Sequence, residues 1–158
     1  MPDLEIVSAW RLDNQNIERA AIQFWNSLKI LPPGIDAAER AKELVAVARL
    51  NDELAGVATA AIEELPIVRS RFAMFRCSVA PEHRRSRIAA ELLVYSKRLL
   101  EQWSLEHPGE DVKGMGIILE AQIDRANEPV WSRSGLTLAG FTPRGQQIRL
   151  AWFAHARI

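Results

Sequence analysis

The sequence predicts a mixed α/β protein in which helices pack on the faces of a central sheet. The aromatic and β-branched run 71–79 is typical of a strand, whereas the apolar residues that follow it recur at the three- and four-residue spacing of a helix. Further strand-like runs lie on both sides of that helix. A strand, a helix and a second strand in that order favour a parallel crossover, so the sheet is expected to be mixed.

The composition indicates one domain, residues 1–158, because 48% of its residues are hydrophobic and a chain of this length can bury a core without disulfides or metals. Twenty basic and twenty acidic side chains cancel, which disfavours nucleic acid or membrane as a partner. A lone cysteine, Cys77, predicts no internal disulfide and is expected to pack inside. The first residues lack a signal-peptide pattern, and no apolar run approaches the roughly 20 residues of a membrane span, so we expect a cytoplasmic protein.

The first half of the chain reads as a strand, two helices and a hairpin. Asp13 or Asn14 can cap the first helix and Asp36 the second, because their side-chain oxygens accept amide hydrogens that the first turn leaves free. The expected elements are a strand at 4–9, an apolar helical face over 17–28, a second helix from 37 towards Glu43, and strands at 44–50 and 54–64 joined by a turn at 51–53.

The second half is expected to close the sheet. The residues after the long helix, 107–109, break helical structure, and a buried strand is predicted at 115–121. Residues 127–134 form a short helix at best, given Pro129, with Gly135 as a left-handed stop. Strands at 136–141 and 147–154 form a final hairpin.

The turn between the strand at 71–79 and the long helix carries charge that suits an anion. Arg84, Arg85 and Arg87 precede the helix, where basic residues oppose the helix dipole and are unfavourable unless an anion binds. Free backbone amides at a helix start favour phosphate. A solvated helix start is the alternative interpretation; a nucleic-acid patch is disfavoured because no aromatic residues interleave with the arginines.

The stretch Val79-x-Pro81-x-x-Arg84-x-x-x-Ile88-Ala89-x-x-Leu92-Leu93 resembles motif A of the GNAT superfamily of acyl-CoA N-acyltransferases. Residues 52–57 look like the hairpin that enters the third strand of that family, and 131–136 lie where it often carries Tyr-x-x-x-Gly-Phe. The resemblance implies a GNAT-like fold, with a central mixed, largely antiparallel sheet and helices on both faces.

The resemblance also implies a co-substrate, acetyl-CoA or another acyl-CoA, because the loop amides of the family cradle the CoA pyrophosphate. Carried over to this chain, the cofactor-binding residues are Ser78, Val79, Arg84, Arg85, Ser86, Arg87, Ile88 and Ala89. Arg87 stands where the family has glycine, which allows close backbone approach and positive φ. Either the guanidinium groups of Arg85 and Arg87 compensate or the loop is degenerate; in a working cradle, Arg87 is expected to keep a negative φ.

Amine acylation needs a base for the amine proton and an acid for the departing thiolate. The family commonly supplies the acid with the motif tyrosine, but Trp131 occupies that position here and cannot donate the proton. Glu120 is our candidate for the base, with Glu63 and Glu64 also available; Glu120 can equally be a solvent-facing strand residue. The three histidines show no metal-ligand spacing, so no metal is expected.

The expected function is acyl-CoA-dependent N-acyl transfer, from acetyl-CoA directly to a primary amine on a small molecule or peptide. The sequence does not name that amine, and it leaves a homodimer open. The alternative is a noncatalytic GNAT-fold module that binds CoA or a protein partner, because the acid and the loop glycine are both replaced.

Overall fold

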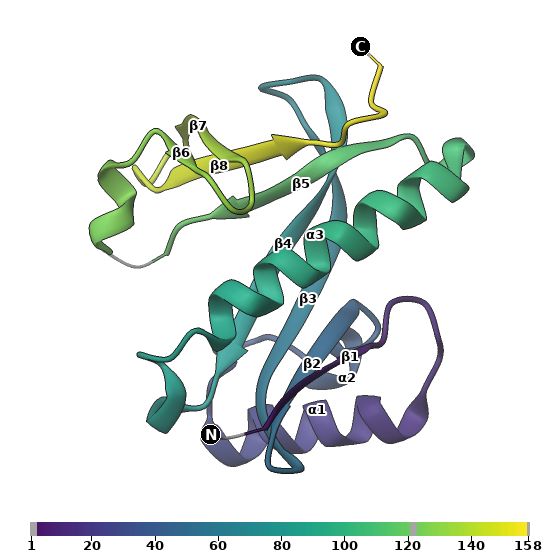
Figure 1. Ribbon diagram of the computed structural model, residues 1–158, viewed down its shortest axis with the longest axis vertical. Coiled ribbons are helices and arrows are strands. Elements are labelled where there is room, and N and C mark those ends of the chain that lie inside the picture. The colour runs from purple at the N-terminus through teal and green to yellow at the C-terminus, as the bar shows by residue number, and fades with distance from the viewer. Residues whose placement is uncertain (1–2, 121–122, 158) are drawn as a thin grey trace. The chain divides into compact units, whose positions relative to one another are not determined.

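A computed structural model of the chain describes residues 3–120 and 123–157. Its elements are β1 (Leu4–Ser8), α1 (Gln15–Leu28), α2 (Ala37–Ala41), β2 (Leu44–Leu50), β3 (Glu53–Leu65), β4 (Ser70–Val79), η1 (Pro81–His83), α3 (Ile88–Glu106), η2 (Pro108–Glu110), β5 (Val112–Ile118), η3 (Asp124–Asn127), β6 (Val130–Trp131), β7 (Leu136–Phe141) and β8 (Gln147–Trp152). The labels α, η and β denote α-helices, 3-10 helices and strands. The strands are hydrogen-bonded in the order β1-β2-β3-β4-β5-β8-β7-β6 (Figure 1).

The chain divides into two compact units. Unit 1 comprises the residues up to Ala60 together with Arg76–Ser96, and unit 2 comprises Ala61–Phe75 and the residues from Lys97 onward. β3, β4 and α3 each begin in one unit and end in the other. Each unit is described by itself below.

Unit 1 begins with three antiparallel strands. β1 pairs with β2 from Leu4↔Leu50 to Ser8↔Ala46, and β2 pairs with β3 down to Leu50↔Glu53. The connection contains Asn51 and Asp52 at φ values of 52° and 67°. Two successive residues at positive φ suit the twist of a tight hairpin, so the turn predicted at 51–53 is confirmed, although β3 already begins at Glu53.

The helices α1 and α2 start where the cap residues predict. The Asn14 side chain accepts hydrogen bonds from the Asn16 and Ile17 amides, at 3.1 and 3.2 Å, and Asp36 accepts from Ala38 at 2.9 Å. The helix α1 lies against this part of the sheet (Figure 1), and its apolar side chains belong to the core there. The buried residues of this cluster include Ile17, Ala21, Phe24 and Trp25 from α1 and Leu44, Val47 and Val57 from the strands.

Helices cover both faces of the sheet in unit 1. Val57 belongs to the core that α1 covers, whereas a Cβ built on its neighbour Gly56 would lie 3.0 Å from both Ile88 and Leu92 of α3. Successive strand residues point to opposite faces, so α1 and α3 lie on opposite sides. The absence of a side chain at Gly56 lets the first turn of α3 approach the strand closely.

Unit 2 contains the parallel pairing of β4 with β5 that the predicted crossover requires. β4 and β5 pair in parallel from Arg71↔Val112 to Met74↔Gly116, while β5–β8, β8–β7 and β7–β6 are antiparallel. The fold is therefore the expected mixed, largely antiparallel sheet. Phe72, Met74 and Leu150 form a buried cluster on one of its faces. Within the described residues, no helix is long and apolar enough to cross a membrane.

Four local expectations differ from the structure. β5 runs over Val112–Ile118 and so begins and ends earlier than the predicted strand at 115–121. Residue 121 of that prediction lies outside the described residues. The short helix expected over 127–134 is wrong: η3 ends at Asn127 and β6 follows, because Pro129 has no amide to continue a helix. Gly135 does have a positive φ of 77°, but it closes the turn between β6 and β7. Cys77 is exposed on β4 instead of packed.

Candidate functional site

The connection from β4 to α3, residues Ala80–Arg87, is called the β4–α3 loop here. The Ala80 amide donates to the Ala55 carbonyl oxygen at 2.9 Å, which fixes the end of β4 against β3. Pro81 then ends the strand, as predicted, and begins η1. All of these residues lie in unit 1, as does the first half of α3.

Part of the hydrogen-bonding capacity of the loop is used internally. The His83 amide donates to Ala80 at 2.8 Å and the Ser86 amide to His83 at 3.0 Å. The Ser86 hydroxyl donates to the His83 carbonyl and accepts from the Ile88 amide at 3.3 Å. Ser86 therefore satisfies the first amide of α3. The amides of Arg85 and Arg87 have no acceptor within the described chain, and they remain available to a ligand.

The three loop arginines differ in what they contact. Arg84 donates from Nε to the Val79 carbonyl oxygen at 3.4 Å, a long hydrogen bond that ties the loop to the end of β4. Arg85 and Arg87 are exposed, and neither forms an ion pair with any residue that the structure describes. The loop therefore presents two uncompensated guanidinium groups beside the positive end of the α3 dipole.

Arg87 occupies the family's glycine position without backbone strain. It is not among the residues with positive φ, and neither is any other residue of the loop. The next residue, Ile88, is only 2% exposed and faces Gly56, so the start of α3 is anchored in the core. Ser78 and Ala89 are half-buried and Val79 is buried. The loop has the ordinary backbone that we expected of a working cradle.

The candidate for the base, Glu120, is not on a strand. It lies in unit 2 beyond the end of β5 at Ile118 and is exposed. Glu63 and Glu64 lie near the end of β3 and are also exposed. The exposure of Glu120 agrees with the alternative interpretation of a solvent-facing residue, whereas the expectation that Glu120 is part of the strand is wrong.

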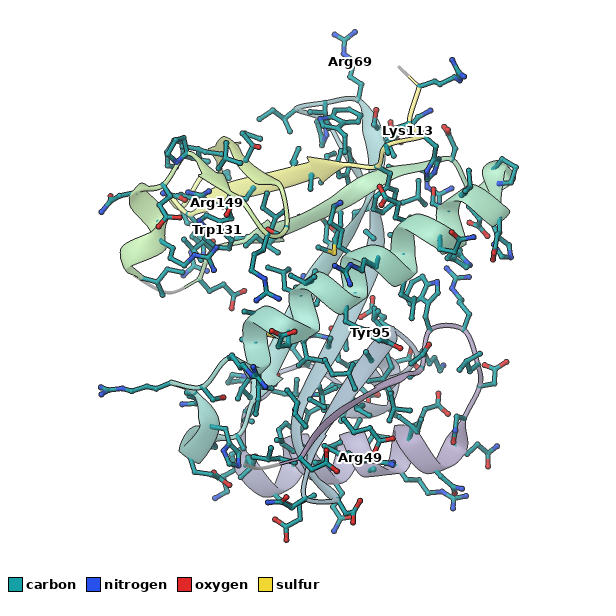
Figure 2. All side chains as sticks on the ribbon, in the orientation of Figure 1. Arg49, Arg69, Tyr95, Lys113, Trp131 and Arg149 are labelled. Atoms are coloured by element: carbon teal, nitrogen blue, oxygen red, sulfur yellow. The ribbon has the colours of Figure 1, made fainter. Side chains whose placement is uncertain are left out.

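Trp131, in the position of the family's tyrosine, is 4% exposed. Its indole Nε1 donates to the Arg125 carbonyl oxygen at 2.8 Å, and the Arg149 guanidinium lies 4.6 Å from its ring centroid (Figure 2). Indole is only a donor and does not titrate near neutral pH, so this side chain cannot protonate a leaving thiolate. Trp131 has a structural role in unit 2.

Arg149 is a buried residue that the sequence analysis does not predict. It lies in the apolar run of β8 and is 0% exposed. The alternation of strand residues places Gln147 and Arg149 on one face, and that pairing of a polar residue with a cation was the available signal. In the part of the chain that the structure describes, no three acidic, histidine or cysteine residues gather as a metal site.

A largely antiparallel sheet with a parallel β4–α3–β5 crossover, and a basic loop at the start of α3, is the arrangement that the resemblance to the acyl-CoA N-acyltransferases implies. The chain belongs to the acetyltransferase (GNAT) family, whose model matches residues 7–109. Members of this family are N-acetyltransferases, and the resemblance seen in the sequence is confirmed. No protein of curated function matches the sequence significantly.

Solved structures confirm the fold. A GNAT-family acetyltransferase from Streptococcus pneumoniae is similar with a TM-score of 0.65 and 13% identity, covering 96% of this chain and 100% of that one. The yncA structure from Salmonella typhimurium, determined with its cofactor acetyl-CoA, has a TM-score of 0.59 and 13% identity over 98% and 96% of the chains. Arabidopsis thaliana Naa50, in complex with the bisubstrate analogue CoA-Ac-MVNAL, has a TM-score of 0.53 and 11% identity over 94% and 97%.

Proposed function

We propose that the chain transfers an acetyl group from acetyl-CoA directly to a primary amine of a small molecule or peptide. Its membership of the acetyltransferase (GNAT) family supports the reaction class. Two relatives in fold support the ligands, since one was determined with acetyl-CoA and another with an analogue that joins CoA to a peptide. Bound acetyl-CoA would supply an activated acyl group as a thioester.

The observation that carries the proposal is the β4–α3 loop. Its amides at Arg85 and Arg87 have no protein acceptor, and the two side chains are exposed without ion pairs in the described chain. Charge-assisted hydrogen bonds from guanidinium to phosphate are about twice as strong as neutral ones. We assign the binding of the CoA phosphates to Arg85, Arg87 and the start of α3.

The other residues of the loop hold this arrangement in place. Arg84 is tied to the end of β4 through its Nε, which leaves its two terminal nitrogens free to donate to phosphate. Ser86 occupies the Ile88 amide, so a phosphate that binds this amide must displace the hydroxyl. The walls of the proposed CoA site are formed by Ser78 and Val79 at the end of β4 and by Ile88 and Ala89 at the start of α3.

Calorimetry with acetyl-CoA, propionyl-CoA and free CoA tests the assignment. Ligand at about 100 times its dissociation constant stabilises a protein with one site by roughly 2.7 kcal/mol. At about 2 to 4 °C for each kcal/mol, the melting temperature should rise by about 5 to 11 °C. Absence of both binding heat and thermal shift with all three ligands would exclude the cofactor.

Replacement of Arg84 locates the phosphate contact. Arg84→Ala should weaken CoA binding by about 1.5 to 3 kcal/mol if the guanidinium donates to a phosphate. Arg69→Ala is the matched control, because Arg69 is an exposed arginine in the β3–β4 turn. Equal affinities for the two variants, with native circular dichroism, would remove Arg84 from the site.

The second candidate function is a noncatalytic module that binds CoA or a protein. The buried, hydrogen-bonded Trp131 favours it, because the family's usual acid is missing. Release of CoA in the presence of a broad amine panel would establish the enzyme, and Glu120→Gln would then test the base. Binding of acetyl-CoA without turnover of any amine would establish the module instead. Sedimentation at micromolar concentration tests whether either form is a homodimer.

A further inference from the structure

A buried cluster in unit 2 is built around the guanidinium of Arg149. The side chain comes from the middle of β8, is 0% exposed, and lies against the Trp131 ring at 4.6 Å (Figure 2). The Arg125 guanidinium lies 4.7 Å from the centroid of the same ring. Two cations thus share one indole, which stabilises each of them through the electrons of the ring.

Three of the five N–H groups of Arg149 are used. Nε donates to the Gln147 side-chain oxygen at 3.0 Å, and Nη2 donates to the carbonyl oxygens of Ala126 and Glu128 at 3.1 and 2.6 Å. Nη1, which carries the other two N–H groups, is buried and has no hydrogen-bond partner in the described chain. Buried donors of this kind are rare in native proteins and indicate a water, an ion or a ligand.

The charge of the cluster is also unbalanced. Glu128 is the carboxylate beside it, and its ion pair is with Arg125, at 3.9 Å. Burial lowers the pKa of Arg149, Glu128 raises it, and Arg125 lowers it further. A guanidinium nevertheless stays protonated at neutral pH. Arg149 is therefore a buried cation that has no ion pair with any described residue, whereas buried charges are normally paired.

We propose that Nη1 of Arg149 binds a small oxyanion, through one oxygen of a carboxylate or a phosphate group. The bidentate contact that arginine usually makes cannot form, because Nε and Nη2 already donate to protein oxygens. A single oxygen of the anion therefore accepts from Nη1 alone. The side chains of Arg125 and Glu128 at the edge of the cluster are 45% and 57% exposed.

Thermal unfolding of the full chain, without CoA, tests the proposal with acetate and inorganic phosphate. Each is compared with chloride at the same ionic strength. The melting temperature should rise by several degrees at about 100 times the dissociation constant. Arg149→Met should abolish the rise with acetate and reduce the rise with phosphate to what the β4–α3 loop contributes, whereas Arg144→Met, which removes an exposed arginine from the β7–β8 turn, should retain the full rise. The anion whose rise falls more in Arg149→Met identifies the group as carboxylate or phosphate.

Nitrogen-15 labelling of the arginines gives a second measurement on the unaltered protein, in case Arg149→Met does not fold. The Nη1 resonances of Arg149 should shift on titration with the effective anion and not with chloride. A melting temperature that neither anion raises above chloride would overturn the proposal. An equal rise in Arg149→Met, or unmoved Nη1 resonances, would overturn it as well and would indicate that a bound water satisfies Nη1.

Discussion

Gly114 of β5 lies between two strands at a point where no side chain fits. It pairs with Phe72 of β4 and Trp152 of β8. The rings of these two residues meet edge to face across it, with centroids 4.9 Å apart and an interplanar angle of 80°. A Cβ at position 114 would lie 2.6 Å from Phe72 Cε2 and 3.0 Å from the Trp152 backbone, and it would also overlap the Ala151 carbonyl oxygen.

We therefore predict that Gly114→Ala destabilises the protein strongly. Ordinary contact begins near 3.4 Å, so the Phe72 ring would have to move by 3.4 − 2.6 = 0.8 Å, yet Phe72 is completely buried. Overpacking costs about 1 to 3 kcal/mol, and the clash with the backbone places the cost at this site near 3 kcal/mol. Loss of the ring pair adds about 1 kcal/mol to this destabilisation. Alanine restricts the unfolded chain more than glycine does, which offsets about 0.5 to 1 kcal/mol. The net loss is about 3 kcal/mol.

Urea unfolding and calorimetry measure this loss, with a fall of about 6 to 12 °C expected in the melting temperature. Gly109→Ala is the matched control, because Gly109 has nothing within 4 Å of a built Cβ and no positive φ; it should change stability by less than about 0.5 kcal/mol. A loss below about 1 kcal/mol for Gly114→Ala would refute the reasoning, because it would mean that β5 and β8 can separate at little cost.

Three further predictions concern the loop, the end of α3 and the two units. Arg87→Gly should leave CoA affinity equal or lower if the guanidinium contacts phosphate, since glycine also loosens the free loop; a gain in affinity by calorimetry would mean that the arginine blocks the site. Ser104→Ala should lower the free energy of unfolding in urea by about 1 to 2 kcal/mol, because the buried hydroxyl donates to the Val112 carbonyl oxygen at 2.6 Å and contacts His155 Nε2 at 3.1 Å. Ser27→Ala is the control and should be nearly neutral, because Ser27 is exposed. Units 1 and 2 should unfold in one calorimetric transition, because β3, β4 and α3 belong to both; two separate transitions would contradict the single domain.

Much of the fold could be predicted because local patterns and tertiary packing agree. Asn14 and Asp36 cap their helices as their side-chain chemistry requires, and β2 runs from Leu44 to Leu50 as predicted. The sequence could not reveal the exposure of Cys77, since strand alternation depends on which face is covered. The sequence does not predict the conformation of the segment before Trp131, because that segment is hydrogen-bonded by the side chains of Gln147 and Arg149, which are distant in the sequence.

The candidate site was only partly predictable. The motif located the β4–α3 loop, and the ordinary φ of Arg87 followed from the steric cost of the alternative. The internal use of the Ile88 amide by Ser86 was not visible, because it depends on the conformation of the turn. Arg149 was hidden for another reason: its alternation with Gln147 indicates a polar face of the strand, but not which residues that face contacts.

Hydrogen bonds from side chains of β6 and β8 limit how far the segment between β5 and β6 can change its length. Residues 125 and 127–130 are exposed and resemble a surface connection of the kind that accepts insertions. The carbonyl oxygens of Arg125, Ala126 and Glu128 are nevertheless bound by the side chains of Trp131, Gln147 and Arg149. These side chains have fixed reach, so an added or deleted residue would break several contacts at once. We expect relatives with another length here to replace Arg149 and Trp131 together, whereas the 142–145 turn can vary alone.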